Sequence, residues 1–429
     1  MKRTPLANSF AVKDTALART PMRVCIHILR DACNDVRVMR AGTTLLKEGF
    51  DVSVIDVQHE RSRPFLTEDV QGMHMNHLFI PGWYTLRHFR LWFLITALRT
   101  FILSIVCLLR SQADIYHAAE VTALPACFIA ARLRRKPLVF EAYELPLANE
   151  AKISYWRGLV GPTRWLLRMI LPRCAAVITT SPLYAREIST HYGVSQISLV
   201  RNVPMYQKVP KNDRLRQRLG LSPKSRIALY QGNLQADRCL DILVRAAAFV
   251  EQDTVIVLMG KNVGTTQDTL EQLIANECLS ERVKILPPVP YKELLLWTAS
   301  ADIGLIVLPL DYSLSIRYTL PNKLFEYLMA GLPVLSSPLD AVVNVIKTYD
   351  VGQIAPSLSP AVIGEAINSM LANRDALVRM RYHALEAAKQ EFNWEKETQQ
   401  LVSLYHTLLH RQDFWHPIDH SSYEKKATA

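Results

Sequence analysis

The chain has 429 residues, which is more than one core usually organises, because single domains rarely exceed about 250 to 300 residues. Hydrophobic residues make up 49% and charged residues 21%, so the composition excludes a disordered or fibrous protein. The 50 Lys and Arg outnumber the 39 Asp and Glu, and the net charge of +11 favours an anionic partner: a nucleic acid, a phosphorylated small molecule or an acidic membrane surface.

The seven cysteines are scattered and include no Cys-x-x-Cys, so they predict neither a zinc cluster nor a disulfide framework. A reducing, cytoplasmic location fits this pattern best. The first twenty residues lack the continuous apolar stretch of a secretory signal, and we expect residues 1–20 to be a disordered tail.

Residues 21–204 are predicted to form a first α/β domain. Apolar runs rich in β-branched residues recur there, with helix-length segments between them. Near-continuous apolar character is typical of parallel strands that helices cover on both faces. We expect strands at residues 22–30, 50–57, 75–82, 113–119, 137–144, 175–181 and 197–204.

Charged residues follow the first of these strands. Asp35, Arg37 and Arg40 stand near the start of the first predicted helix, together with Gly42. Ligands of such folds bind beyond the carboxyl ends of the strands, so Arg37 and Gly42 are candidates for the lining of a ligand cleft.

Polar residues also mark the ends of two later strands. His117 ends one strand, and Glu141 and Glu144 flank the end of the next. These side chains are candidates for the same cleft, with His117 in a catalytic role. The alternatives are a histidine satisfied within the core and two solvated glutamates.

The most apolar run, Leu91 to Leu109, predicts a buried or interfacial helix. Arg99 lies near its middle, and a charge there would be costly inside a bilayer, so the helix is predicted not to span a membrane. The overlapping aromatic and basic stretch at residues 82–93 suits contact with an anionic membrane, or else an ordinary helix packed between domains.

Residues 205–225 are charged, contain Pro and lack a sustained apolar run, so they are the predicted linker. Residues 226–391 then repeat the alternation of strands and helices and predict a second α/β domain. Its strands are expected at residues 226–233, 254–260, 282–289, 301–309, 332–338 and 351–357. Residues 411–429 are predicted to be a polar tail.

The most informative segment of the second domain is residues 315–338. Pro321 can open a helix, and its first turn, with Asn322, Lys323 and Leu324, would present free backbone amides to a diphosphate. Glu326 lies on nearly the same face as Lys323 and could accept hydrogen bonds from ribose hydroxyls. The alternative is an ordinary Lys–Glu pair on a helix surface.

A second informative segment follows the strand at 226–233. The strand ends at Gly232, a polar loop begins at Asn233, and Arg238 stands near the start of an amphipathic helix. An arginine at this place can bind phosphate in a bidentate manner. The alternative is one solvated arginine among many.

Several segments, in this order, resemble the bacterial-type family 4 (group 1) glycosyltransferases of the GT-B fold. They are DVRVMRAGTTLLKEGFDVSVI, DIYHAAEVTALPACFIAARLRRKPLVFEAYELP, AAVITTSPLYAREISTHYG, VRNVP, LYQGNLQADRCLDILVRAA and, most specifically, PNKLFEYLMAGLPVL. The resemblance implies two Rossmann-like domains facing a cleft, with a nucleotide-sugar donor bound mainly by the second. It also implies transfer with retention, no metal and no cofactor, and a final helix, residues 392–410, that crosses back to the first domain.

The resemblance also assigns residues. Glu326 matches the second glutamate of the family's Glu, seven residues, Glu motif, and Arg238 matches the basic residue that contacts the diphosphate. The first glutamate falls at Tyr318, which is therefore a candidate donor-site residue. In the family's His-x-His-Asp pattern, His117 matches the first His. The chain departs from the family pattern at Tyr318, Cys239, Ala119, Glu120 and Tyr143.

The sequence therefore predicts a retaining glycosyltransferase that moves a sugar from a UDP or GDP donor to a glycan or lipid-linked acceptor, in the cytoplasm or at the cytoplasmic face of a membrane. A weakened relative that serves as a binding or scaffold partner in glycan assembly is the alternative. A nucleic-acid partner is not expected, because no DNA or RNA recognition motif is visible.

Overall fold

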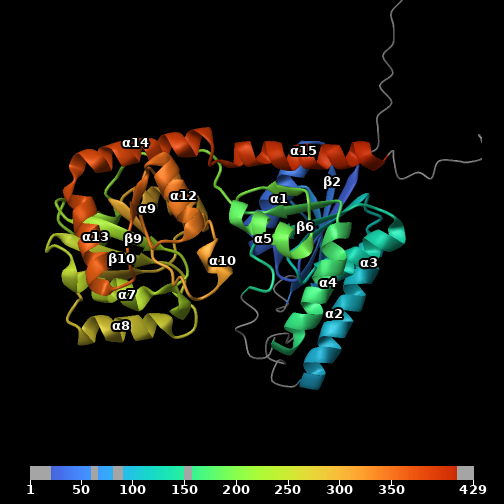
Figure 1. Cartoon of the computed structure of the whole chain (residues 1–429), viewed down its shortest axis with the longest axis horizontal. Coiled ribbons are helices and arrows are strands. Elements are labelled where there is room, and N and C mark those ends of the chain that lie inside the picture. The colour runs from blue at the N-terminus through green and yellow to red at the C-terminus, as the bar shows by residue number, and fades with distance from the viewer. Residues whose placement is uncertain (1–20, 59–65, 81–89, 149–156, 413–429) are drawn as a thin grey trace, which may run out of the picture.

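A computed structural model describes residues 21–58, 66–80, 90–148 and 157–412 of the chain. These residues form two α/β domains, each built on its own sheet, which lie side by side along the long axis of the molecule (Figure 1). The predicted fold class, two Rossmann-like domains, is confirmed.

The first sheet has eight strands in the order β3-β4-β2-β1-β5-β6-β7-β8, and all neighbours are parallel except β3 and β4. Each strand predicted in this domain is present. The short, polar strand β3 was not predicted, because an edge strand with few apolar residues has no alternating pattern to read. The bounds are β1 (Arg23–His27), β2 (Asp51–Gln58), β3 (Thr67–Val70), β4 (Met73–Phe79), β5 (Ile115–Ala119), β6 (Leu138–Ala142), β7 (Ala176–Thr179) and β8 (Ile197–Leu199).

The second sheet has six parallel strands in the order β11-β10-β9-β12-β13-β14. All six were predicted from apolar runs. Nearly every residue of the central strands β10, β9 and β12 is buried, because both of their faces are covered. The bounds are β9 (Arg226–Gln231), β10 (Thr254–Met259), β11 (Val283–Leu286), β12 (Ile303–Ile306), β13 (Val334–Ser336) and β14 (Gly352–Ile354).

Helices cover both faces of the first sheet. One apolar cluster lies under α2 (Arg90–Arg110), α3 (Leu124–Arg134), α4 (Arg157–Ile170) and α5 (Pro182–Tyr192), and contains Leu108, Leu124, Leu167 and Ile188. The opposite cluster lies under α1 (Val36–Lys47) and the C-terminal helix α15 (Trp394–Gln412), and contains Leu45, Leu401 and Tyr405.

The second sheet is enclosed in the same way by two apolar clusters. Its helices are α6 (Arg214–Leu219), α7 (Leu240–Ala246), α8 (Thr266–Asn276), α9 (Leu294–Thr298), α10 (Leu314–Arg317), α11 (Asn322–Met329), α12 (Asp340–Tyr349), α13 (Pro360–Ala372) and α14 (Arg374–Gln390).

The segment predicted as a linker, residues 205–225, is largely part of the second domain. Val209 and Leu215 are buried in a core cluster of that domain, and Arg216 donates to Asp302 at 2.5 Å. Residues 214–219 form α6. The charged residues that suggested a linker therefore include those of α6, a helix that packs with one side on the second domain.

The chain crosses between the domains a second time after α14. The α15 helix runs along the first domain, as Figure 1 shows in red at the top. Trp394 attaches the start of α15 to two segments: its backbone N–H donates to Pro204 O at 2.9 Å, and its indole donates to Thr44 Oγ1 of α1 at 2.9 Å.

The α2 helix differs from the buried helix that was one expectation. Thr100, Ser104 and Leu108 are buried, but Trp92, Leu94, Ile95 and Leu98 in its first half are exposed. The segment Trp92–Arg110 is long and apolar enough to cross a membrane by length and composition. Because one side of α2 packs on the first domain, we retain the prediction that it does not span a bilayer.

Candidate functional site

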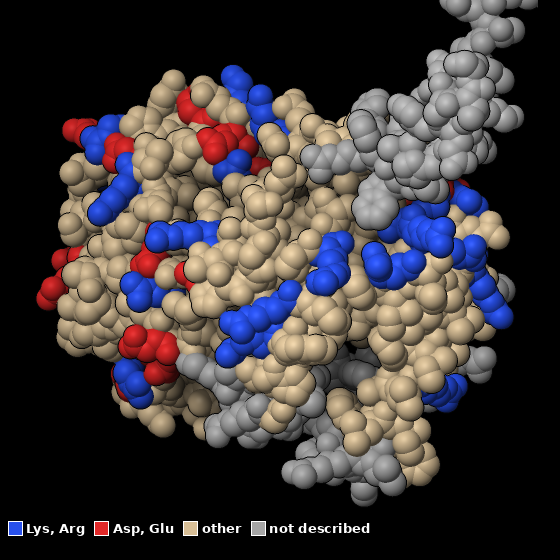
Figure 2. All heavy atoms as spheres, turned by 45° about the vertical axis from the view of Figure 1, so that its right-hand side comes forward, with Lys and Arg blue, Asp and Glu red and all other residues tan. Residues whose placement is uncertain are grey.

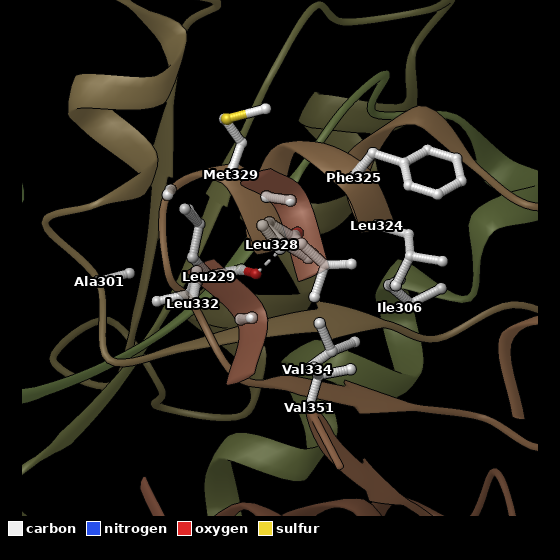
Figure 3. Close-up of a cluster of buried hydrophobic side chains, with 14 of the residues drawn as sticks. Leu229, Ala301, Ile306, Leu324, Phe325, Leu328, Met329, Leu332, Val334 and Val351 are labelled. Atoms are coloured by element: carbon white, nitrogen blue, oxygen red, sulfur yellow. Dashed lines mark hydrogen bonds between the residues drawn. The ribbon is translucent and has the colours of Figure 1, made fainter. Parts of the chain in front are cut away.

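The α11 helix carries the most specific motif of the sequence. It begins at Asn322, because Pro321 is extended (ψ 145°) and precedes the helix as its N-cap. Leu324, Phe325 and Leu328 share one face and are buried in the core cluster drawn in Figure 3. This burial fixes the rotation of the helix, so Lys323 and Glu326 lie on the face turned away from the core.

The first turn of α11 offers fewer free amides than the sequence suggested. Pro321 has no N–H, and the Leu324 N–H donates to Pro321 O at 2.9 Å, so the expectation that Leu324 presents a free amide is wrong. The amides of Asn322 and Lys323 remain without an intrahelical acceptor, as first-turn amides do. Two backbone amides, those of Asn322 and Lys323, are thus placed to bind an anion.

Lys323 lies against the end of β9. Its Nζ stands 3.6 Å from the centroid of the Tyr230 ring, a cation–π contact. A Cβ atom on Gly232 would be 3.2 Å from Lys323 Nζ, and Gly232 has a positive φ of 134°. Glycine is therefore needed for both the backbone conformation and the room for the lysine. Asn233, the next residue, accepts the Tyr230 hydroxyl through its carbonyl at 2.9 Å.

Glu326 is held by a short chain of hydrogen bonds. Gln231 Nε2 donates to Glu326 Oε2 at 2.5 Å, and Thr298 Oγ1 donates to Gln231 Oε1 at 2.6 Å. Glu326 forms no ion pair with Lys323 in the described part of the chain, so the alternative of a surface Lys–Glu pair is wrong. Burial raises the pKa of Glu326, against the opposing effects of Gln231 and Lys323.

Burial also acts on Lys323. It lowers the pKa of this ammonium group to about 7, with a further lowering by the nearby charge of Arg238. A lysine with a pKa near neutrality is incompletely charged at rest and gains a full charge when an anion binds. Lys323 can therefore take up a proton when a phosphate binds beside it.

Arg238 ends a 3-10 turn, Ala236–Arg238, between β9 and α7. Its side chain is one third exposed, and its Nε lies 3.5 Å from Asp237 Oδ1, which is buried and accepts no hydrogen bond among the described residues. Cys239 follows with a left-handed φ of 53°, a conformation that glycine adopts more easily than other residues. The guanidinium is thus available to a ligand.

Two candidates of the first domain, His117 and Arg37, are buried inside the protein and do not line a cleft. His117 is buried: its Nε2 lies 3.1 Å from Glu141 Oε2, and its Nδ1 lies 2.6 Å from the Tyr405 hydroxyl. Arg37 is also buried, donates to Glu141 Oε1 from Nε at 2.8 Å, and packs on Trp394. The expectation that His117 and Arg37 line the ligand site is wrong, because they face α15 and all their polar atoms bind protein.

Gly42 and Glu144 have different positions. A Cβ on Gly42 would stand 2.3 Å from Met73 Sδ, so this glycine allows α1 to pack closely on the sheet and does not line a cleft. Glu144 is exposed in the loop after β6. The N–H of the next residue, Leu145, donates to Ser315 Oγ of the second domain at 3.3 Å, so Glu144 lies where the two domains meet.

Tyr318 belongs to a contact between the domains. Its carbonyl accepts the Ser181 hydroxyl at 2.7 Å, and its side chain packs on the core of the first domain. Tyr184 donates to the carbonyl of Ser315 at 2.6 Å in the same contact. The structure therefore places Tyr318 in the contact between the domains, and its contact with a donor stays a prediction.

Arg40 of the first domain lies near the second-domain cluster. It donates from Nη2 to the Tyr291 hydroxyl at 3.1 Å, and its charge opposes the rise in the pKa of Glu326. The sequence analysis placed Arg40 among the basic residues at the first helix that could line the cleft. It did not identify Tyr230, Gln231 and Thr298, whose roles depend on neighbours remote in sequence.

The site thus combines two basic side chains, a carboxylate fixed by an amide, an aromatic ring and two helix amides. Among the described residues, no group of three His, Cys, Asp or Glu side chains is arranged to hold a metal ion. The cluster is chemically suited to an anionic ligand that also carries hydroxyl groups.

Comparison with known proteins assigns both domains. Residues 35–203 match the family described as Glycosyltransferase Family 4, and residues 211–387 match that described as Glycosyl transferases group 1. D-inositol 3-phosphate glycosyltransferase 1 from Catenulispora acidiphila is 24% identical over 312 residues, which cover 69% of this chain and 72% of that protein. Two further relatives, from Nocardia farcinica and Corynebacterium glutamicum, are covered over 62% and 51% of their length.

Solved structures share the fold across both domains. Sucrose-phosphate synthase from Thermosynechococcus elongatus has a TM-score of 0.74 at 17% identity, covering 91% of this chain and 99% of that one. HepE from Anabaena, solved with UDP and glucose, has a TM-score of 0.68 at 15% identity, covering 90% and 100%. The two family matches follow one another along the two domains, so the chain belongs to the group 1, family 4 glycosyltransferases of the GT-B fold.

Proposed function

We propose that the protein is a metal-independent, retaining glycosyltransferase that moves a hexose or related sugar from a UDP or GDP donor to a glycan or lipid-linked acceptor. The observation that carries this proposal is the cluster of Lys323, Arg238 and Glu326 at one edge of the second sheet. Its parts match those of a nucleoside diphosphate: two cations and two amides for the phosphates, and a carboxylate for the ribose hydroxyls.

In this proposal the second domain acts mainly on the leaving group. The bond between the anomeric carbon and the diphosphate oxygen breaks, and its electron pair leaves with the diphosphate. Arg238 and protonated Lys323 offset the charge that develops there. The acceptor hydroxyl attacks from the same face, which retains configuration, and its proton passes to the leaving oxygen. No side chain is assigned as a nucleophile.

The weakened relative is the second candidate, and two observations favour it. Tyr318 takes the place of the family's first glutamate and is engaged in the contact between domains. His117 is buried against Tyr405, away from Lys323 and Glu326. A protein that binds the nucleotide without transferring sugar would serve as a partner in glycan assembly.

A pair of assays separates these candidates. Thermal shift with UDP, GDP and their sugars reports donor binding, since a ligand at about 100 times its Kd adds about 2.7 kcal/mol of stability. Release of nucleoside diphosphate is then measured with acceptors that include inositol phosphates, on which the relatives act by name, and lipid-linked glycans. Binding with turnover in the presence of a chelator supports the transferase, and binding without turnover supports the partner role. Absence of both contradicts each candidate.

Arg238→Ala is the matched test of the diphosphate contact. Loss of a charge-assisted phosphate contact is expected to weaken UDP or GDP binding about ten- to a hundred-fold. Arg245→Ala is the control, because Arg245 is an exposed arginine of α7 that pairs with Asp241 and Glu277. Equal affinity in both variants and the wild type would reject Arg238 as the contact.

A further inference from the structure

One side of the first domain combines exposed apolar side chains with unpaired positive charge. The first half of α2 exposes Trp92, Leu94, Ile95, Leu98 and Ile102, each by about half or more of its surface. Trp165 of α4 is 66% exposed. We call the exposed side chains of α2 and α4 the α2–α4 face. Isolated apolar side chains on a surface are ordinary, but a row of five on one helix marks an interaction site.

The charge around this face has a single sign. Residues 90–110 and 157–173, which contain α2 and α4, include seven Arg and no Asp, Glu or Lys. Arg99, Arg164, Arg168 and Arg173 are exposed, and within the described residues none of them forms an ion pair with a carboxylate. Figure 2 shows the first domain, on the right, with blue side chains on a tan surface and very little red.

The position of the face follows from the topology. α2 connects β4 to β5, and α4 connects β6 to β7, with all these strands parallel. A crossover helix runs opposite to its strands, so both helices start at the edge where the strands end. Figure 1 shows the lower halves of α2 and α4 extending below the sheet. The exposed row at 92–102 therefore lies at the edge of the first domain that also carries the loop of Glu144.

We infer that the α2–α4 face docks on the surface of an anionic lipid bilayer. A row of apolar side chains with two tryptophans and flanking arginines is the composition of a helix that lies in the interface of a membrane. Cytoplasmic leaflets carry anionic lipids, which match the exposed arginines of α2 and α4, whereas a second copy of this face would meet it with like charge. Arg99 on the exposed side of α2 suits the headgroup layer and opposes burial in hydrocarbon.

Docking here would bring the loops at the strand ends to the membrane surface. If the proposed function holds, a lipid-linked acceptor then reaches the junction of the domains without leaving the bilayer. Membrane binding itself does not depend on that function, since no residue of the α2–α4 face belongs to the cluster around Lys323.

Vesicle flotation of the full chain tests the inference. Vesicles of phosphatidylcholine alone are compared with equimolar phosphatidylcholine and phosphatidylglycerol, at low and high salt. Wild type is expected to float with the anionic vesicles and to be released by salt. Leu94→Ser with Leu98→Ser, and Arg164→Glu with Arg168→Glu, are each expected to lower partitioning by about ten-fold or more.

Matched controls lie on the second domain. Val378→Ser with Tyr382→Ser removes apolar side chains that are 69% and 62% exposed on α14, against 60% and 59% for Leu94 and Leu98. Arg218→Glu with Arg374→Glu changes two exposed arginines of the second domain. These controls should float like the wild type.

The inference is overturned if wild type fails to bind anionic vesicles, if the control pairs lose binding as much as the test pairs, or if Leu94→Ser with Leu98→Ser dissociates a dimer instead. UDP and GDP binding is measured on the same preparations. Nucleotide binding without vesicle binding rejects only the membrane inference, and the reverse result rejects only the proposed function.

Discussion

Lys323 is the residue whose protonation distinguishes the empty site from the occupied one. Its pKa of about 7, against an ordinary 10.5, means that the ammonium group is partly deprotonated at neutral pH. A bound diphosphate favours the charged form, so binding above pH 7 should take up a proton. We expect affinity for UDP or GDP to fall by up to about ten-fold per pH unit as the pH rises above 7.

Calorimetric titration at pH 8 in two buffers of different ionisation enthalpy measures that proton directly. Lys323→Met should bind more weakly and show no proton uptake. Identical pH profiles for this variant and the wild type would exclude Lys323 as the titrating group. The stability of the empty protein should change with pH in the opposite direction to nucleotide affinity. The pKa of Lys323 is about 7 in the folded protein and 10.5 in the unfolded chain, so the unfolded chain binds this proton more tightly. The amount by which Lys323 destabilises the fold therefore decreases as the pH rises from 7 to 10.5.

Glu326 offers a test of nucleotide recognition that leaves the fold in place. Glu326→Gln keeps the size of the side chain and one acceptor for Gln231 but removes the charge. Charge-assisted hydrogen bonds are about twice as strong as neutral ones, so binding of UDP or GDP should weaken several-fold to a hundred-fold, with little change in the Tm of the empty protein. Unchanged affinity by calorimetry would show that Glu326 only orients Gln231.

At the scale of elements, α15 is attached to the first domain through a buried polar network. A carboxylate can only accept, so His117 Nε2 donates to Glu141 and Nδ1 accepts the Tyr405 hydroxyl. Burial by itself would raise the pKa of Glu141, but Arg37 and His117 lower it to about 2. The network thus links α1, β5, β6 and α15.

Glu141→Gln should therefore destabilise the first domain by about 3 to 5 kcal/mol, because Arg37 would keep a buried charge without its counter-ion. Tyr405→Phe, which removes one hydrogen bond, should cost only about 0.5 to 1.5 kcal/mol. Chemical denaturation measures both. In wild type the contribution of Glu141 is present above about pH 4.5 and is lost as the pH falls towards 2. Similar stabilities for the two variants would contradict this account.

At the scale of the molecule, the contact of α10 with the first domain sets how the domains meet. Tyr184→Phe with Ser181→Ala removes two hydrogen bonds to the segment around Ser315 and Tyr318. Each bond contributes about 1 kcal/mol, so more open arrangements should be populated and the radius of gyration in solution scattering should increase. Nucleotide affinity should not change. Tyr382→Phe, an exposed tyrosine, is the control, and equal scattering curves would show that the contact does not hold the domains.

Of the fourteen strands in the described residues, thirteen were predicted from the sequence, as was the helix with Lys323 and Glu326, because these depend on local patterns. A strand covered on both faces must be apolar along its length, and the buried positions of α11 recur at helical spacing. Only β3 was not predicted, since a polar edge strand lacks such a pattern. The two-domain organisation was predicted from the same alternation of apolar strands and helix-length segments.

Only the tertiary structure decided which polar residues share a site. His117 and Arg37 stand at strand and helix ends, as ligand-binding residues would, but the return of α15 from the far end of the chain encloses them. Tyr318 is drawn into the contact between domains, while Gln231 and Thr298 meet Glu326 from separate elements. Local sequence determines where an element begins and which face is apolar. What covers its polar face is a contact between segments that are far apart in the chain, and periodicity does not encode such a contact.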